Sequence, residues 1–480
     1  MARKKRKGFM TAFSIIFILI FILGLLTHVL PQAEFVDGTI VNGSGVVGAK
    51  LSEILLSPIL GFENAVDVCI FILILGGFLA IVARSEALET GIQVLVKKLK
   101  GNELALIPIL MFIFSIAGTT YGMLEETVGF YAILAAAMVM AGMDTIVSSA
   151  IVLLGAGSGV LGSTVNPFAV GVAVGALPEG VTVNQGTIIF IGVLLWLSTL
   201  AISIFFVRSY AKRVIKKKGS TILSLRERKN MELEYGGNAA KNQDNIKLNQ
   251  KQILTLILFA LSFVIMIIGF IPWEDFGVTI FANTTGWLTG SPLGRWYFYE
   301  AAIWFLIMSV VIGFVTRTGE HQFVDTFIDG ADDMVGVVLI VAIARGTSVL
   351  MQSTYLDNFI IHNTAELLRI VPPVVFAPLN YILHVILSIL VPSSSGLATI
   401  SAPIIGPLAH QIGYSTEVSL MTMVAANGLV NLITPTCGAI MGGLALAKVE
   451  YTTWVRWAGK VVATIAIANI VILTLLMVIL

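Results

Sequence analysis

Runs of apolar residues long enough to cross a lipid bilayer recur along almost the whole chain. A helix needs about 20 predominantly apolar residues to span the hydrocarbon core. Only 12% of the 480 residues are charged, against about 25% in soluble domains. The sequence therefore predicts an all-α polytopic membrane protein. The convincing spans are 9–30, 67–84, 185–207, 252–272, 295–317, 334–351 and 457–479.

Four other apolar stretches do not have the length of a simple span. Stretches 145–178 and 418–447 are too long for one ordinary helix and too short for two, so each predicts a broken transmembrane helix. Stretches 104–140 and 373–412 are interrupted halfway by tight-turn sequences, GTTYG and PSSSG. Their short arms suit re-entrant helical hairpins that end near the midplane. Two complete crossings for each interrupted stretch are the alternative.

Basic residues predict the orientation, because positive charge collects on the cytoplasmic side. With the N-terminus inside, the C-terminus outside and nine crossings, 25 of the 29 Lys and Arg residues lie inside. The basic stretch 208–251 is then a cytoplasmic linker between the N-terminal membrane repeat, 1–207, and the C-terminal one, 252–480, which begins with a linking helix, 252–272. The early basic run of this linker suits anionic lipid, but a topology determinant is the simpler interpretation. We predict a multi-pass protein of the cytoplasmic (inner) membrane.

The two halves share one order of elements: a span, an interrupted segment, a broken stretch and a last span. Helix 252–272 adds one crossing between them, so the second copy is predicted to be inverted. Inverted repeats are typical of secondary transporters, because the two arrangements can exchange roles and expose one site alternately to each side. The pattern favours a carrier. A channel is the alternative, since polar hairpin tips also build filters.

Irregular backbone is expected at four places, the tips 118–127 and 392–396 and the breaks 162–167 and 432–438. Unpaired backbone groups are not tolerated in lipid, so such segments line protein or a water-filled cavity. They are rich in Gly, Pro, Ser, Thr and Asn, whose oxygens can bind an ion or polar solute. Half-helix N-termini after each break suit a carboxylate. Close helix packing alone is the simpler alternative, but two matched pairs favour a central site.

Charged residues inside the membrane are also candidates, because each costs about 2.5–3.5 kcal/mol on insertion scales. Glu125 and Glu126 follow the first tip, and Arg345 lies within its span. One glutamate suits a cation ligand or proton carrier, unless the pair marks a solvated outer turn. Arg345 suits either a glutamate partner or a substrate carboxylate. With these three, the candidate substrate- and ion-binding residues are Gly118, Thr119, Thr120, Gly122, Ser163, Thr164, Asn166, Pro167, Ser393, Ser394, Ser395, Gly396, Asn431, Thr434 and Thr436.

Signals of enzyme chemistry are weak. The GxGxxG match at 157–162 lies inside an apolar stretch with no preceding strand, and no Walker A, HExxH or GxSxG sequence is present. The five histidines have no ligand spacing, and His384 suits a satisfied structural role. Cys69 and Cys437 form no disulfide or metal pattern. We predict no enzyme activity, metal or cofactor, and leave open a coupling ion, a proton or sodium.

Several of these motifs together resemble a known family. GTTYGMLEETVGFY (118–131), GSTVNPFAVGVA (162–173) and the later SSSG and TPT elements are similar to YfcC/DcuC-type carriers. These belong to the anaerobic four-carbon dicarboxylate carrier family of the ion transporter superfamily. The resemblance covers essentially the whole chain. It implies inverted repeats, two re-entrant hairpins, a homodimer, an elevator-like motion and a site lined by the tip and break residues named above. The tips differ from the Ser-Asn-Thr of sodium-coupled dicarboxylate carriers, which counts against sodium coupling.

The branch of this family that the chain resembles includes proteins regarded as basic amino acid carriers, among them arginine–ornithine exchangers. Glu125 and Glu126, next to a tip, suit a cationic side chain better than a dicarboxylate. Hydroxyl groups, helix N-termini or Arg345 could take the carboxylate of an amino acid. We therefore predict a secondary carrier for an amino acid. The amino acid is predicted to be basic and to be exchanged for another one, as arginine is for ornithine. A four-carbon dicarboxylate carrier is the alternative.

Overall fold

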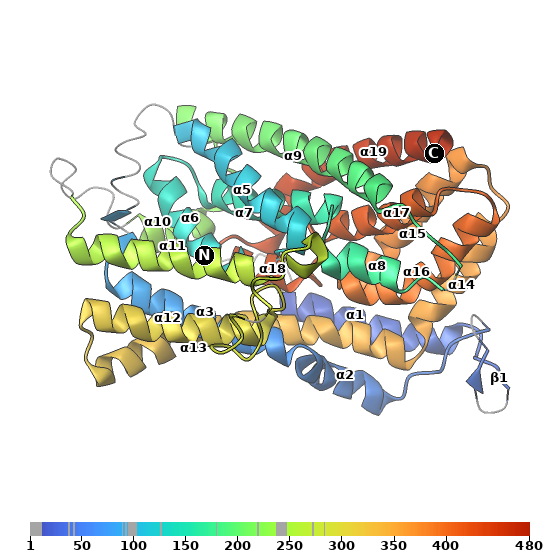
Figure 1. Cartoon of the computed structure of the whole chain (residues 1–480), viewed down its shortest axis with the longest axis horizontal. Coiled ribbons are helices and arrows are strands. Elements are labelled where there is room, and N and C mark those ends of the chain that lie inside the picture. Colours follow the sequence, from blue (N-terminus) through green and yellow to red (C-terminus); the bar gives the residue numbers. More distant parts are fainter. Residues whose placement is uncertain are drawn as a thin grey trace, which may run out of the picture.

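The computed structural model is almost entirely helical (Figure 1). Its strands, within the described residues, are two-residue β1 (Phe35–Val36) and β2 (Thr39–Ile40), which pair antiparallel. The predicted all-α polytopic class is confirmed. The structure describes residues 12–36, 39–41, 44–88, 90–91, 94, 103–124, 127–178, 180–217, 220–236, 247–270, 273–282 and 284–480.

Nine helices in the described part of the chain are long and apolar enough to cross a membrane. The sequence also predicts nine crossings, but the two sets differ. The first arm of each hairpin is long enough, whereas the apolar stretch Ile16–Val29 and the helix Thr416–Val430 are shorter. Length therefore does not separate a re-entrant hairpin from a crossing, and re-entry stays a prediction. The nine are Val66–Arg84, Glu103–Thr120, Thr145–Gly162, Gln185–Lys216, Gln250–Phe270, Phe298–Thr316, Glu320–Ser353, Pro373–Leu390 and Tyr451–Ile479.

The same order of elements occurs twice: a helical hairpin, a broken helix and a long last helix. Both arms of each hairpin pack against the broken helix of their own half. Figure 1 shows the first hairpin toward the left and the second toward the right. The inverted relation of the halves stays a prediction. The first set is α5 (Leu106–Tyr121), α6 (Val128–Met140), α7 (Thr145–Gly162), the π-helix η3 (Pro167–Gly171), α8 (Val172–Gly175) and α9 (Gln185–Lys216). The second set is α15 (Pro373–Leu390), α16 (Ser394–Gln411), α17 (Thr416–Val430), α18 (Gly438–Leu446) and α19 (Tyr451–Ile479).

Helix α13 is the longest of the remaining elements, with 34 residues. It begins 14 residues before the predicted span 334–351. The charged residues before that span are therefore helical as well. It packs against α1, α2, α3 and α18, so it connects the N-terminal helices to the second broken helix. The remaining elements are α1 (Ala12–Val29), α2 (Leu51–Asn64), α3 (Val66–Arg84), η1 (Glu103–Ala105), α10 (Leu225–Tyr235), α11 (Gln250–Phe270), η4 (Trp273–Phe276), α12 (Phe298–Thr316), α13 (Glu320–Ser353) and α14 (Leu356–Leu368).

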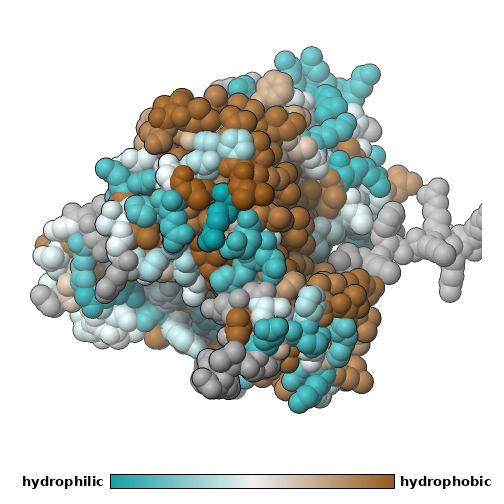
Figure 2. Space-filling view, turned by 90° about the vertical axis from the view of Figure 1, so that its right-hand side faces the viewer, coloured by the Kyte–Doolittle hydropathy of each residue, from teal (hydrophilic) through white to brown (hydrophobic). Residues whose placement is uncertain are grey.

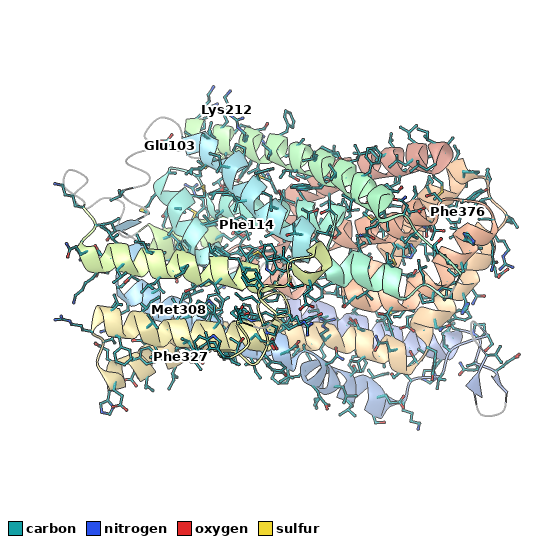
Figure 3. All side chains as sticks on the ribbon, in the orientation of Figure 1. Glu103, Phe114, Lys212, Met308, Phe327 and Phe376 are labelled. Carbon is teal, nitrogen blue, oxygen red and sulfur yellow. The ribbon has the colours of Figure 1, made fainter. Side chains whose placement is uncertain are left out.

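The buried apolar residues form two separate cores. The first joins both hairpins, both broken helices, α9 and α19, and the second joins α3, α11, α12 and the middle of α13. Phe114 and Phe376 belong to the first core and Met308 to the second; Figure 3 shows the first pair in the upper part of the molecule and Met308 in the lower part. Residues close to the first hairpin tip, Ala117 and Met123, pack into the second core. The two cores therefore meet at the hairpin tips.

The outside of the helices is apolar over long stretches. Phe190 and Phe205 of α9, Ile257 of α11 and Phe314 of α12 are all exposed. Figure 2 shows the end of the molecule with the β1–β2 hairpin, where polar residues gather toward the centre and left and broad apolar areas lie above them and to their right. Apolar side chains that face outward are expected where the surrounding solvent is lipid.

The linker helix α10 is held against the second half by buried polar contacts. Glu227 is 1% exposed, and its carboxylate accepts hydrogen bonds from the backbone N–H of Glu450 (2.8 Å) and the hydroxyl of Thr453 (3.1 Å) at the start of α19. Lys448 forms an ion pair with Glu234 of α10 at 3.7 Å. The linker is therefore part of the packed structure as well as a connection between the halves.

A second buried carboxylate ties the linker to the first broken helix. Asp144 precedes α7, and it accepts hydrogen bonds from the hydroxyls of Tyr210 and Thr221, both at 2.6 Å. Burial raises the pKa of the Asp144 carboxyl, although these hydrogen bonds favour its charged form. Tyr235 of α10 also donates a hydrogen bond to the carbonyl oxygen of Leu446 in α18, so the linker contacts both broken helices.

We expect Glu227→Ala to lower the thermal stability of the purified protein. The change leaves the N–H of Glu450 and the hydroxyl of Thr453 without their acceptor. Losing charge-assisted hydrogen bonds at a buried site costs about 2 kcal/mol, which corresponds to several degrees in melting temperature. Glu232→Ala, at an exposed position of the same helix, is the control. Equal melting temperatures for the two variants would show that the α10 contact contributes nothing.

Candidate solute site

The first hairpin tip is bonded directly to the first helix break. The backbone N–H of Thr164 donates to the carbonyl oxygen of Thr119 at 2.9 Å, and the two hydroxyls are 3.2 Å apart. A Cβ at Gly118 would collide with the carbonyl oxygen of Ala156 in α7. Glycine is required there because the hairpin backbone lies directly on the helix backbone.

Asn166 organises the first break. Its Oδ1 accepts from the N–H groups of Phe168 (2.9 Å) and Ala169 (3.3 Å), and its Nδ2 donates to the Ser163 hydroxyl at 3.0 Å. Gly122 has a left-handed φ of 81°, and a Cβ there would be 2.8 Å from the Asn166 amide. The helix N-terminus after this break is therefore already capped by Asn166, which reduces its capacity for a carboxylate.

Asn427 plays the corresponding role in the second half. Its Oδ1 accepts from the Ser394 hydroxyl at 2.7 Å and from Nδ2 of Asn431 at 3.1 Å. Its Nδ2 donates to the carbonyl oxygens of Pro392 (3.3 Å) and Val391 (3.5 Å). Asn427 is 2% exposed, so one buried amide joins the tip of the second hairpin to the last turn of α17.

The second break differs from the first because its following helix has no side-chain cap. Cys437, the residue before α18, makes no capping hydrogen bond with its side chain. Thr434 and Thr436 share a hydrogen bond of 2.7 Å, and Thr436 donates to the carbonyl oxygen of Ile389 at 2.9 Å. The side chain of Cys437 therefore does not cap the first N–H groups of α18, and a helix N-terminus of this kind favours an anionic group.

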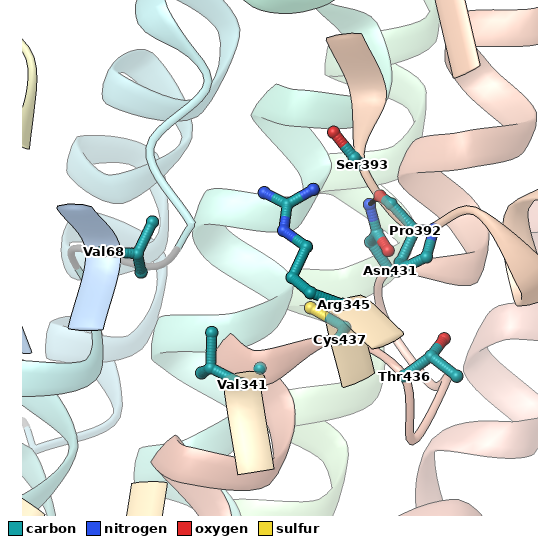
Figure 4. Close-up of a pocket in the computed structure, with 9 residues that line it drawn as sticks. Val68, Val341, Arg345, Pro392, Ser393, Asn431, Thr436 and Cys437 are labelled. Atoms are coloured by element: carbon teal, nitrogen blue, oxygen red, sulfur yellow. Dashed lines mark hydrogen bonds between the residues drawn. The ribbon is translucent and has the colours of Figure 1, made fainter. Parts of the chain in front are cut away.

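A cavity of about 40 Å³ lies between the second tip, the second break, α3 and α13. Figure 4 shows the Arg345 side chain between Val68 on one side and Ser393 and Asn431 on the other. Arg345 is the one charged side chain among the described residues that line this cavity. None of the described carboxylates is within 4 Å of its guanidinium group. A cation in this position suits a carboxylate from outside the protein.

Asn431 adds an acceptor to the same cavity. Its Nδ2 donates to the carbonyl oxygen of Pro392 at 2.9 Å and to Oδ1 of Asn427 at 3.1 Å. Its Oδ1 is buried and has no hydrogen-bond partner in the described structure. Rotating the amide would place its oxygen against two acceptors, so the network fixes this orientation. A buried acceptor without a partner suits a donor brought by a ligand or by water.

The cavity lies at the junction of the two apolar cores. Val68 and Val341 belong to the second core, and Cys437 belongs to the first. A volume of about 40 Å³ is enough for water, but it is well below the roughly 300–1,000 Å³ of ligand pockets. The cavity would therefore have to widen before an organic solute could bind in it.

The structure brings only some of the predicted site residues together. Arg345, Ser393, Asn431 and Thr436 line the cavity. Ser394, Ser395, Gly396 and Thr434 belong to the network directly around it. The predicted residues of the first half, Gly118, Thr119, Gly122, Ser163, Thr164 and Asn166, form their own bonded cluster, and Thr120 donates to the carbonyl oxygen of Ile116.

Three predicted residues cannot be placed in the same way. Glu125 and Glu126 lie outside the described residues, so their relation to Arg345 stays a prediction. Pro167 is the first residue of η3. Asn427, by contrast, was missed by the sequence analysis. The available signal was an asparagine one helical turn before Asn431, in the otherwise apolar stretch 423–430.

Other polar groups have structural roles. His384 is fully buried, with Nδ1 2.8 Å from the carbonyl oxygen of Asn380 and Nε2 2.6 Å from the Ser401 hydroxyl. This confirms the satisfied histidine that was predicted. Cys69 and Cys437 are both buried, and they do not form a disulfide. In the part of the chain that the structure describes, no group of three His, Cys, Asp or Glu side chains could hold a metal.

Comparison with known sequences gives three matches. A family model described as "C4-dicarboxylate anaerobic carrier" matches residues 9–478. An uncharacterized protein of Haemophilus influenzae is 29% identical over 423 residues, which cover 88% of this chain and 78% of the relative. An Escherichia coli protein, "Putative basic amino acid antiporter YfcC", is 26% identical over 425 residues, 86% of this chain and 77% of the relative.

Two solved transporter structures are similar to the chain over nearly its whole length. The YdaH transporter of Alcanivorax borkumensis has a TM-score of 0.47 and 16% identity, covering 96% of this chain and 97% of that one. MtrF of Neisseria gonorrhoeae has a TM-score of 0.43 and 16% identity, covering 99% and 96%.

Proposed function

The chain belongs to the C4-dicarboxylate anaerobic carrier family, and from this premise we propose that it carries an amino acid, a basic one, across the cytoplasmic membrane in exchange for another. Membership of this family confirms the family that the motifs resemble. It also makes the chain a multi-pass membrane carrier and not an enzyme. The substrate, the exchange and the membrane are our proposals.

The cavity around Arg345 carries this proposal. A guanidinium group and the N-terminus of α18 meet there, without a carboxylate from the described residues. Arginine binds carboxylates through two parallel hydrogen bonds, and a helix N-terminus adds partial positive charge. We infer that the carboxylate of the solute binds between Arg345 and Gly438, the first residue of α18.

Asn431 supports an amino acid over a simple organic acid. Asn431 lines the same cavity as Arg345, and its Oδ1 has no hydrogen-bond partner among the described residues. An α-ammonium group carries three donors and needs acceptors of this kind. The amino and carboxylate groups of one amino acid would therefore both find partners, while a dicarboxylate would leave this acceptor without a donor.

A basic side chain is supported from two other directions. The Escherichia coli relative is named for basic amino acids. Glu125 and Glu126 follow the first hairpin tip in the sequence, which offers negative charge for a cationic side chain. A four-carbon dicarboxylate is the second candidate, because Arg345 is the one charged side chain among the described residues of the cavity.

Alternating access is the transport mode that we propose. The cavity lies between two apolar cores and is too small for an amino acid as it stands. Relative movement of the cores at this junction would open it to one side at a time, in the elevator-like manner that the family resemblance implies. The coupling ion, the homodimer and the placement of the N-terminus inside and the C-terminus outside stay predictions.

Counterflow in proteoliposomes tests the substrate. Vesicles are preloaded with unlabelled arginine or succinate, and uptake of the matching labelled compound is followed. We expect arginine counterflow that ornithine competes, and no succinate counterflow. Succinate counterflow alone would contradict the amino acid proposal and favour the dicarboxylate. Protein-free vesicles and vesicles with denatured protein are the controls.

We expect Glu125→Gln or Glu126→Gln to abolish exchange of a basic amino acid without lowering the amount of protein in the membrane. Glutamine keeps the size of the side chain but removes the charge that a cationic solute needs. Counterflow and membrane abundance are measured together for each variant. Normal exchange by both single variants would remove the pair from the mechanism.

A further inference from the structure

A separate hollow of about 620 Å³ lies along one face of α9. Its lining includes Ala201, Ile204 and Phe205, then Arg208 and Lys212. These positions follow the helical pattern i, i+3, i+4, i+7 and i+11, so they lie on one side of the helix. Leu104 of η1 also lines the hollow, from the segment that precedes the first hairpin.

The chemistry of this face changes along the helix axis. The part up to Phe205 is apolar, and the part from Arg208 onward is basic and polar. The predicted span ends at residue 207, whereas α9 continues to Lys216. The hollow therefore crosses the level at which the helix leaves the apolar phase, with an apolar half inside and a basic half at the polar interface.

The basic half has no acidic counterpart among the residues that the structure describes. Arg208 and Lys212 are both exposed and form no ion pair with any carboxylate that the structure describes. Glu103 and Lys212 lie at the same end of the molecule (Figure 3), but Glu103 does not line the hollow. A bound anion would therefore meet two cations in the hollow and no carboxylate from its described lining.

We propose that this hollow is a binding site for one anionic phospholipid. The phosphate group binds Arg208 and Lys212, and an acyl chain covers Phe205, Ile204 and Ala201. Basic residues that only set the orientation of a helix in the membrane need no hollow and no apolar surface next to them. A bound phospholipid needs both. The site lies on α9, apart from the Arg345 cavity, and does not depend on the proposed substrate.

Native mass spectrometry of the purified full-length protein tests the proposal. Phosphatidylglycerol, phosphatidylcholine and soluble glycerol phosphate are titrated against wild type and the double variant Arg208→Gln, Lys212→Gln. Loss of two interfacial cations is expected to weaken phosphatidylglycerol binding about 30-fold. The control variant Arg213→Gln, Lys216→Gln has the same charge change on α9, but its positions do not line the hollow. It should bind within about twofold of wild type.

The three ligands separate the possible occupants. Preferred binding of phosphatidylglycerol, reduced by Phe205→Ser as well as by the first double variant, supports a lipid site. Equal binding of phosphatidylcholine would overturn the anionic preference. Binding of glycerol phosphate as tightly as the lipid would show a soluble anion site instead. Equal effects of the two double variants would show that the lipid is attracted by net charge in general, which would overturn the proposed site.

Discussion

Arg345→Ala is expected to abolish solute exchange while the protein stays in the membrane at the wild-type level. The guanidinium group lines the cavity at the junction of the two cores and has no ion-pair partner among the described residues. Its removal therefore leaves no protein charge unpaired in the described structure, but it removes the cation that the solute carboxylate needs. Truncating one partner of such a pair costs about 2–5 kcal/mol, at least a 30-fold loss.

Two further variants make the Arg345 result specific. Arg345→Lys keeps the charge but loses the bidentate geometry, so partial activity is expected. Val341→Ala changes an apolar residue of the same cavity and should keep most of the exchange. Counterflow per molecule of membrane protein is the measurement. Wild-type exchange by Arg345→Ala would exclude this cavity as the carboxylate site.

Asn427→Ala is expected to cause the second large loss. The Asn427 amide links Ser394, Asn431 and the carbonyl oxygen of Pro392, all within 3.3 Å. Without it, several buried polar groups lose their partners, at about 1–3 kcal/mol each. We expect exchange to fall at least 30-fold and the melting temperature to fall as well, because the second tip is no longer fixed on α17.

Thr422→Val is the matched control for Asn427→Ala. Thr422 is buried in the same helix, and its hydroxyl donates at 2.7 Å to the carbonyl oxygen of Val418 one turn earlier. That carbonyl keeps its place in the helix when the hydroxyl is removed, so a small effect is expected. Equal losses of exchange in the two variants would indicate that α17 is sensitive to substitution in general. Wild-type exchange and melting temperature for Asn427→Ala would show that this amide is not required.

The positions of the helices and their interruptions could be predicted because apolar length and turn residues are local signals. The interruptions lie where the turn residues predict them, after Tyr121 and between α15 and α16. The irregular backbone is shorter than expected, because residues 118–121 form the last turn of α5 and residues 394–396 form the first turn of α16. The ends of α9 and α13 could not be predicted from apolarity, since both helices continue into charged residues outside the apolar runs. Helix formation there depends on propensity and packing.

The sequence predicts which types of residue form the candidate site, but not which of these residues form hydrogen bonds with each other. Hydroxyl and amide residues at the breaks indicated polar chemistry, yet the sequence does not say which of them bond to each other. Asn166 caps the first half-helix, whereas Cys437 leaves the second without a side-chain cap. This asymmetry depends on side-chain geometry across the break. In our proposal this asymmetry places the carboxylate site in the second half, with Arg345, whereas the motifs in the sequence do not distinguish the two halves.

Protection of a cysteine at Ser393 by solute tests the central claim most directly. The variant is made in a transport-competent background with Cys69 and Cys437 replaced by alanine, and its alkylation by a small aqueous thiol reagent is followed over time. Ser85→Cys is the control, because Ser85 is half-buried in a different cavity. The account predicts that a transported amino acid slows alkylation at position 393 and not at 85, and that Arg345→Ala removes this protection. Alkylation at position 393 that every transported solute leaves unchanged would contradict it.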